Sequence, residues 1–290
     1  MTSEVAAAPP KAPPSRLITP ARGWAFVELA ALWRYRQLVW LLASRDMRLR
    51  YRQALLGVTW VVLQPLATAA MFALLFGALI DPERLPGPPG IPYWVSTYCG
   101  LILWQLFARS LTAAGNSLVA NQHLITRIYF PRIILPVASI LAVVADFAVT
   151  LALLAGILGW RGQLPGVALL AALPIVALTC LAALALALWL SALNALYRDA
   201  QYLTGYLLQL WMLASPVLYT SEALLAAYPR WRWLYALNPM AGLVEGFRWS
   251  LLAGEGPPPP WAAGLALLAA LALAGGFFFK RMERRFVDLL

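Results

Sequence analysis

Six long apolar runs dominate this sequence, and they limit the chain to folds that cross a lipid bilayer. A helix that crosses the hydrocarbon core of a bilayer needs about 20 apolar residues in succession. Six segments have this character: 58–80, 93–117, 133–159, 165–194, 202–219 and 261–279. We therefore expect an all-α integral membrane protein with six transmembrane helices. An even number of spans places both termini on the same side.

Composition supports this fold class. The 290 residues are 62% hydrophobic and 12% charged, whereas roughly a quarter of the residues are charged in ordinary soluble domains. The net charge of +10 would suggest nucleic acid as a partner for a soluble domain. In membrane proteins, however, Lys and Arg collect in the cytoplasmic segments. We therefore expect membrane lipid, and no nucleic acid, around this chain.

The distribution of basic residues predicts the orientation. Nine Lys and Arg residues precede the first run and four follow the last one. The loops at 81–92 and 220–260 show no such excess. The positive-inside rule therefore places both termini, and the loops near 118–132 and 195–201, in the cytoplasm.

The segments outside the spans have distinct compositions. Residues 1–23 are rich in Pro and Ala, which predicts a disordered N-terminal tail. Residues 24–57 predict a cytoplasmic amphipathic interfacial helix and a hinge, since Trp and Arg suit the membrane interface; packing of this helix on the protein's own spans is the alternative. Residues 58–279 form the predicted six-span domain, and 280–290 a cytoplasmic tail. The apolar face of the interfacial helix consists of Trp24, Val27, Ala31, Tyr35, Leu38 and Leu42.

The outer loop between the fifth and sixth spans predicts two short helices. Asn238 followed by Pro239 is a good helix start, because Asn caps the first turn and Pro suits the first helical position. The helix would extend for about 14 residues, or about 21 Å, which is too short to cross the bilayer. Ser221 is the expected cap of the other helix. We expect both to be re-entrant, which requires surrounding protein or a water-filled cavity.

No catalytic constellation is present, so the chain is not expected to be an enzyme. His123 is the only histidine, which excludes a Ser-His-Asp triad and a histidine-based metal site within one chain. The sequence lacks the G-x-x-x-x-G-K-[ST] phosphate loop. A transport function would need energy from a partner or from an ion gradient.

Ion coupling would require ionisable residues within the spans, and Arg109 and Asp146 are the clear candidates. Arg109 can extend to the inner interface. Asp146 is expected about 20 Å above the inner end of its span, about 10 Å deeper than Arg109. We therefore expect Asp146 to bond a hydroxyl or amide on a neighbouring helix, since no second ionisable group is predicted near it. A polar channel lining or a proton site is the alternative.

Several segments resemble the ABC-2 type permeases that export polysaccharides. The stretch RDMRLRYRQALLGVTWVVLQP (45–65) resembles the start of their first span. NQHLITRIYFPRIILP (121–136) and YRD (197–199) correspond to their other cytoplasmic segments, and SPVLY (215–219) and NPMAGLVEGFR (238–248) to motifs at the outer end. Arg127 stands where Lys is usual in the family.

The resemblance implies a homodimer bound to two copies of an ATP-binding subunit. That subunit would hold ATP and Mg, and this chain would need no cofactor or metal. The implied substrate is a polyprenyl-diphosphate-linked glycan of the O-antigen, capsule or teichoic acid type, exported across the bacterial cytoplasmic (inner) membrane. The alternative is an ABC-2 exporter of drugs or other lipids. A membrane glycolipid enzyme is less favoured, because the cytoplasmic carboxylates are too sparse.

The same resemblance suggests three sets of site residues. Candidates for coupling to the ATPase are Arg45, Asp46, Arg48, Tyr51, Asn121, Leu124, Phe130, Pro131, Arg132, Arg198 and Asp199. Aromatic candidates for the substrate channel are Phe72, Phe76, Tyr98, Trp104, Phe107, Tyr206, Trp211 and Tyr219. Candidates for an outer gate are Trp231, Trp233, Asn238 and Pro239.

The coupling residues and the channel aromatics each have an alternative interpretation. Leu124, Ile125 and Phe130 would serve as apolar anchors for the ATPase, with Arg127 and Arg132 at a polar rim; an ordinary solvated loop is the alternative. The aromatic rings would offer flat apolar faces and hydroxyl contacts to sugars, or would anchor the chain in lipid.

Overall fold

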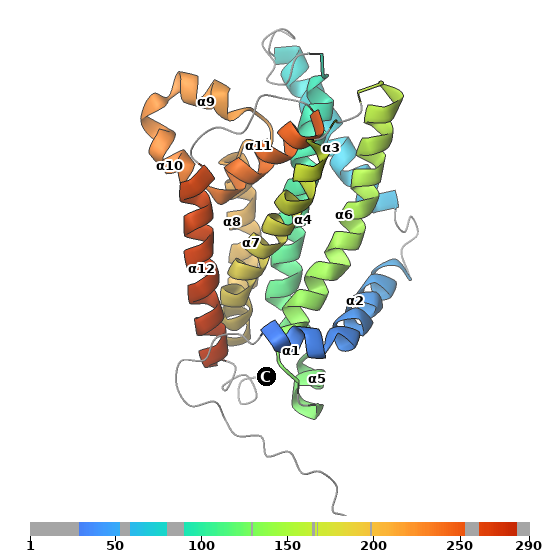
Figure 1. Cartoon of the computed structure of the whole chain (residues 1–290), viewed down its shortest axis with the longest axis vertical. Coiled ribbons are helices and arrows are strands. Elements are labelled where there is room, and N and C mark those ends of the chain that lie inside the picture. Colours follow the sequence, from blue (N-terminus) through green and yellow to red (C-terminus); the bar gives the residue numbers. More distant parts are fainter. Residues whose placement is uncertain are drawn as a thin grey trace, which may run out of the picture.

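The fold consists of long helices that run side by side, with shorter helices at both ends of the bundle (Figure 1). The computed structural model describes residues 29–52, 59–79, 90–128, 130–163, 166, 168–197, 199–252 and 261–282. The predicted tail at 1–23, the start of the interfacial segment and the tail at 283–290 lie outside the described residues.

The longer helices are α2 (Arg36–Tyr51), α3 (Thr59–Leu79), α4 (Tyr93–Ala120), α6 (Ile134–Trp160), α7 (Leu169–Leu196), α8 (Ala200–Leu213), α11 (Pro239–Leu252) and α12 (Trp261–Met282). The short elements are α1 (Leu29–Arg34), α5 (Gln122–Arg127), α9 (Ser221–Ala227), the 3-10 turn η2 (Pro229–Trp231) and α10 (Arg232–Ala236).

Helix α4 occupies the centre of the bundle (Figure 1), where it packs against α3, α6, α7, α8 and α11. Most of its side chains are buried. Small residues allow these close contacts: a side chain at Gly115 would collide with Leu190 of α7. We call the two ends of the bundle the α5 end and the α9 end.

Four described helices, α3, α6, α7 and α12, are long and apolar enough to cross a membrane. The predicted second span corresponds to α4, whose 28 residues give about 42 Å of helix. Its lower apolarity reflects polar residues such as Gln105 and Arg109.

The predicted fifth span, 202–219, is wrong as one continuous helix. Helix α8 ends at Leu213, and residues 214–219 form turns. Pro216 explains the break, because it lacks an N–H group and disfavours helical geometry at the preceding Ser215. Helix α8 has 14 residues, or about 21 Å of length, which is less than the thickness of a bilayer core.

Helix α2 packs against α6, and the apolar face predicted for the interfacial helix makes this contact. Leu42 is buried, and Tyr35 and Leu38 are partly buried in the same cluster. Trp40 on the other side of α2 is 62% exposed, and Trp33 in the preceding helix α1 is 74% exposed. The helix therefore packs on the protein with one face and offers an aromatic ring to its surroundings with the other.

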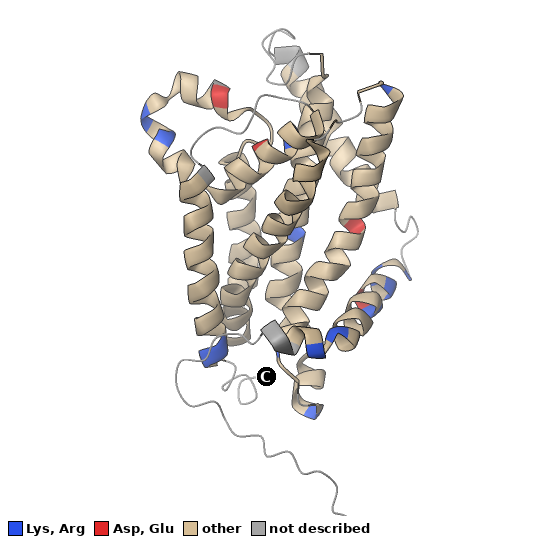
Figure 2. Cartoon of the chain, viewed as in Figure 1, with Lys and Arg blue, Asp and Glu red and all other residues tan. Residues whose placement is uncertain are grey.

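The basic residues gather towards the α5 end (Figure 2). They belong mainly to α1, α2, α5 and the last turn of α12. The α9 end carries fewer basic groups, including Arg161, Arg230 and Arg232.

Candidate functional site

At the α5 end, a hydrogen-bonded junction connects two segments in which coupling residues were predicted. Arg45 of α2 donates to Asn121 Oδ1 at 2.6 Å and to Asp46 Oδ1 at 2.8 Å. Asn121 lies at the junction of α4 and α5 and donates through Nδ2 to Ser117 O at 2.9 Å. Three of the predicted coupling residues thus form one network between α2, α4 and α5.

The apolar side chains of α5 and the following turn are used within the fold. Ile125 and Phe130 are each 7% exposed and lie in a cluster with Leu42, Ile134 and Phe279. Leu124 packs on the edge of this cluster. These side chains hold α5 on the bundle, so its surface presents other residues: His123, Thr126 and Arg127 are exposed, as is Ile128 directly after the helix.

The remaining coupling candidates are dispersed. Arg48 is exposed on α2, Pro131 and Arg132 are half-buried before α6, and Asp199 is exposed at the start of α8. Arg198 lies outside the described residues.

Tyr51 is not part of the junction at the α5 end. It lies at the end of α2 and contacts the middle of α6. Its hydroxyl donates to one carboxylate oxygen of Asp146, and the guanidinium of Arg50 pairs with the other. Burial, and then the bond to Asp146, raise the pKa of Tyr51 to about 12. The phenol therefore keeps its proton at neutral pH and acts as the donor.

The surroundings of Asp146 agree with one prediction and contradict another. A hydroxyl from a neighbouring helix does bind Asp146, as predicted, but the expectation of no second ionisable group nearby is wrong. Arg109 lines the same small cavity, although its Nη2 donates to Gln64 Oε1 of α3 at 2.7 Å and not to Asp146. Arg50 was missed as a partner because α2 was expected at the membrane interface, away from the middle of α6.

Towards the α9 end, three predicted channel aromatics form one cluster between α4 and α8. Trp211 lies edge-on to Phe107 at a centroid distance of 5.2 Å and to Trp104 at 6.2 Å. Trp104 and Phe107 are 5.5 Å apart.

The other channel candidates are separate from this cluster. Phe72 and Phe76 stack on α3 at 6.2 Å. Tyr98 is fully buried and donates to Thr150 O at 3.3 Å, so it lines no open path in this structure. Tyr206 is 61% exposed on the outer face of α8. Tyr219 donates to Leu213 O at 3.2 Å across the turn that ends α8.

Asn238 connects this turn to α11 and is the predicted cap of that helix. Its Oδ1 accepts from Met240 N at 3.1 Å and from Trp211 Nε1 at 2.9 Å. Its Nδ2 donates to Ala214 O and to Ser215 Oγ. Pro239 is the first residue of α11, which has 14 residues as expected. The helix start is therefore confirmed, and its cap also binds the end of α8.

Arg248 of α11 was not among the predicted site residues. It is 6% exposed and donates to Ser96 O, Val217 O and Tyr219 O. The bonds to Val217 O and Tyr219 O satisfy carbonyl groups of the turn after α8, which a buried broken helix requires. Gly100 of α4 makes room for it, since a Cβ there would lie 2.7 Å from Arg248 Nη2. The pattern GFR inside an otherwise apolar segment was the available signal.

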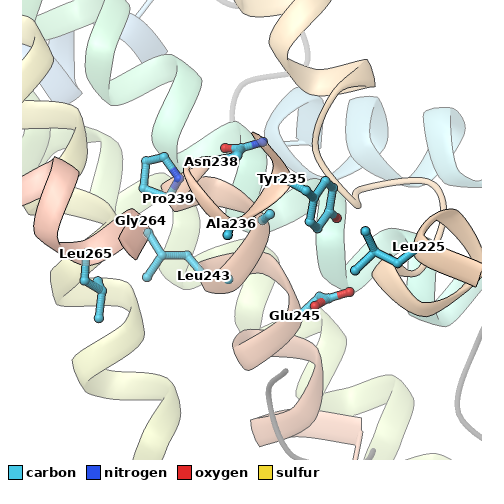
Figure 3. Close-up of a pocket in the computed structure, with 11 residues that line it drawn as sticks. Leu225, Tyr235, Ala236, Asn238, Pro239, Leu243, Glu245, Gly264 and Leu265 are labelled. Carbon is cyan, nitrogen blue, oxygen red and sulfur yellow. The ribbon is translucent and has the colours of Figure 1, made fainter. Parts of the chain in front are cut away.

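Ser221, the predicted cap of α9, is the first residue of that helix, and its role as a cap stays a prediction. Its hydroxyl bonds the Tyr235 hydroxyl at 2.6 Å, and its backbone N–H donates to Glu245 Oε1 at 2.6 Å. Figure 3 shows Glu245 and Tyr235 pointing towards the side of Leu225, in a small pocket bounded by α9, α10, α11 and α12. The carboxylate of α11 thus secures the start of α9.

A much larger cavity, of about 790 Å³, lies beside this pocket. Its lining comes from α4, α7, α8, α9, η2, α10, α12, the first residue of α11 and the turns between these elements. The predicted residues that contribute to it are Phe107, Trp211, Tyr219, Trp231, Asn238 and Pro239. Trp233 does not line it and is 68% exposed.

Comparison with known proteins supplies the family context. The family model described as "ABC-2 type transporter" matches residues 37–252. An O-antigen export system permease protein RfbA from Myxococcus xanthus is 28% identical over 261 residues, which cover 89% of this chain and 96% of the relative. A protein of the same name from Klebsiella pneumoniae is 24% identical over 254 residues, covering 86% and 93% of the two chains.

Proposed function

The chain belongs to the ABC-2 type transporter family, and we propose that it is the transmembrane subunit of an exporter of lipid-linked polysaccharide. The observation that carries this proposal is the similarity to O-antigen export permeases along nearly the whole chain. The substrate is a glycan of the O-antigen, capsule or teichoic acid type on a polyprenyl diphosphate. It crosses the bacterial inner membrane.

In this proposal the membrane domain has six spans, with both termini in the cytoplasm. Helix α4 is the second span, and helix α8 together with the turn at residues 214–219 forms the fifth as a broken element; the four more apolar helices are the others. The gathering of basic residues towards the α5 end supports this orientation. Helices α9 to α11 are then re-entrant elements of the outer leaflet, where Asn238 and Arg248 satisfy the broken backbone.

Force reaches the bundle through the α5 end. A separate ATP-binding subunit, which holds ATP and Mg, contacts the exposed side of α5 and the exposed Asp199 at the start of α8. The bond between Arg45 and Asn121 carries movement of α5 to α2. Helix α2 in turn meets the middle of α6 through Arg50, Tyr51 and Asp146. The contact residues are His123 and Arg127 of α5 and Ile128 directly after it, because Ile125 and Phe130 are buried in the fold.

The glycan passes between two copies of this chain. The outer face of α8 supports this arrangement, since Tyr202, Tyr206 and Leu210 are 82%, 61% and 46% exposed there. Exposed aromatic rings offer flat faces and hydroxyl groups to sugars without desolvating a charge. Phe72 and Phe76 on α3 are further candidates for this path.

The proposal is tested by co-expression with a candidate ATP-binding subunit from the same source. We expect the two proteins to copurify and lipid-linked glycan to stimulate ATP hydrolysis. The variant Asp199→Lys should lose the stimulation, whereas Arg161→Glu, exposed at the α9 end, should retain it. Failure to copurify with such a subunit would refute the coupling, and stimulation by unrelated lipids alone would favour export of drugs or other lipids.

A further inference from the structure

We propose that the 790 Å³ cavity at the α9 end binds the acyl chains of a membrane phospholipid, with the phosphate of the headgroup held by Arg230 and Arg232. We call this cavity the lipid pocket. The proposal concerns a ligand other than the transported glycan and does not depend on which substrate is exported.

The walls of the lipid pocket are apolar. Leucine and alanine side chains come from α7, α8, α9, α10, α12 and the turns, and rings come from α4, α8, η2, α10 and the turns. The lining leucines and alanines are Ala182, Leu186, Leu213, Ala214, Leu224, Leu234, Leu237, Leu267, Leu268 and Leu271. A cavity with such walls favours hydrocarbon, because it offers little to hold water.

The polar side chains deeper in the pocket already have partners within the protein. The Asn238 amide bonds Trp211, Met240, Ala214 and Ser215. Tyr219 donates to Leu213 O, and the Tyr235 hydroxyl bonds Ser221. A sugar entering here would lose its hydrogen bonds to water without regaining them from these groups, and unpaired buried polar groups are costly. The pocket therefore selects against glycan and for hydrocarbon.

The size of the pocket suits the chains of one phospholipid. At roughly 30 Å³ for a water-sized group in a liquid, the volume holds on the order of 25 methylene groups. One or two acyl chains have this size.

The rim of the pocket has the chemistry of a headgroup site. Tyr228 and Trp231 line the pocket and are 59% and 56% exposed, as aromatic residues at a membrane interface are. Arg230 and Arg232 flank Trp231 and are exposed. Basic positions colour the turn between α9 and α10 in Figure 2. Neither arginine forms an ion pair with another described residue, so both can meet a phosphate.

The test uses the full-length protein in nanodiscs of phosphatidylglycerol that contain a photoactivatable acyl chain. After irradiation, the labelled peptides are mapped by mass spectrometry. We expect labelling of residues 211–237 and 264–271 well above that of Leu170 and Leu173, which are 75% and 78% exposed on α7. Labelling no stronger than at these two leucines would overturn the proposal, because it would mean ordinary lipid contact.

Variants locate the site. Leu267→Trp fills the pocket from its mouth, since Leu267 lines it and is 37% exposed, and should abolish the labelling. The matched control Leu173→Trp should leave it unchanged. Replacing both Arg230 and Arg232 by Gln should weaken labelling, by about fivefold for each arginine removed near an anionic surface. Arg161→Gln, exposed at the same end, is the control.

A competing occupant is examined by adding polyprenyl phosphate. If it displaced the phospholipid label from the pocket at equal concentration, the assignment to a phospholipid would be wrong and the pocket would bind the carrier lipid. If Leu267→Trp failed to fold, judged by its melting temperature, the double arginine variant would decide. Its unchanged labelling would contradict the proposed headgroup site.

Discussion

Two charged residues inside the bundle, Asp146 and Arg248, connect segments of the fold. Asp146 joins α2 to α6, and Arg248 binds the turn after α8. Asp146 binds Arg50 and Tyr51 and so attaches the end of α2 to the middle of α6. Arg248 binds the carbonyl groups of the turn that ends α8. Neither charge lies in a cluster arranged for catalysis, and both are used to satisfy or connect backbone segments.

The contact between Arg50 and Asp146 predicts a measurable coupling energy. In a double-mutant cycle with Arg50→Gln and Asp146→Asn, we expect a coupling of about 0.5–2 kcal/mol, as for polar contacts between helices in membranes. SDS unfolding titrations of the four proteins measure it. Arg48→Gln with Asp146→Asn is the control, because the Arg48 side chain bonds only Ser44 O, at 3.2 Å, among the described residues. Equal coupling in both cycles would contradict the contact.

The close approach of Arg248 to α4 predicts that Gly100 tolerates no side chain. The added methyl group of Gly100→Ala would lie 2.9 Å from Val217 O as well as against Arg248. We expect a loss of about 1–3 kcal/mol in the free energy of unfolding, as is typical of overpacking.

Gly156→Ala on α6 is the matched control for this substitution. A Cβ at Gly156 would have no other atom within 4 Å, so alanine should stabilise the helix by up to about 1 kcal/mol. The same unfolding titration measures both variants. Equal stability of the two would show that Arg248 does not occupy the space beside Gly100.

Among the secondary-structure elements, the start of a short helix can be predicted from its local sequence, but the residues that it contacts elsewhere in the fold cannot. The start of α11 at Asn238 and Pro239 could be predicted, because capping and proline geometry are local. The end of α8 was missed, although Pro216 marks it, because the apolar run continues past the proline. Only the structure shows that Asn238 and Arg248 donate hydrogen bonds to carbonyl groups of the turn after α8 and so stabilise the end of that helix.

The same distinction applies to the candidate site. Residues 45–46 and 121 could be singled out from the family pattern, but their hydrogen bonds depend on how α2 packs across the bundle. Ile125 and Phe130 were expected to face a partner, and the apolar spacing alone could not show that their burial serves the chain's own core. Their roles in coupling remain predictions.

The surface of α5 leads to a prediction about the partner. Arg127→Glu reverses an exposed charge on α5 and should weaken copurification of the ATP-binding subunit by about tenfold or less, as expected for a charge at the rim of an interface. Increasing salt should weaken the wild-type complex as well. Quantitative pull-down measures both effects. Binding unchanged by the reversal would exclude Arg127 from the interface.

Across the whole molecule, the α5 end and the α9 end differ in composition and structure. The α5 end carries most of the basic residues in the described part of the chain, and the junction between α2, α4 and α5. The α9 end carries short helices around an apolar cavity. The bundle between them has α4 at its centre.

The difference between the two ends predicts which residues a membrane-impermeant reagent can reach from each side of the membrane. After replacement of Cys99 and Cys180 by alanine, single cysteines at His123 and Tyr228 are treated with a membrane-impermeant thiol reagent. Both positions are exposed in the structure. We expect His123→Cys to react only in inside-out vesicles and Tyr228→Cys only in intact spheroplasts. The reverse pattern would invert the proposed topology.

Transport by a reconstituted complex tests the proposed export function. The chain and its ATP-binding subunit are placed in proteoliposomes with the nucleotide site outside, and lipid-linked glycan is supplied in the outer leaflet. We expect ATP hydrolysis to move the glycan into the lumen, where an added glycosidase can no longer degrade it. Glycan that stays fully sensitive to the glycosidase, while ATP is hydrolysed by the intact complex, would contradict export by this chain.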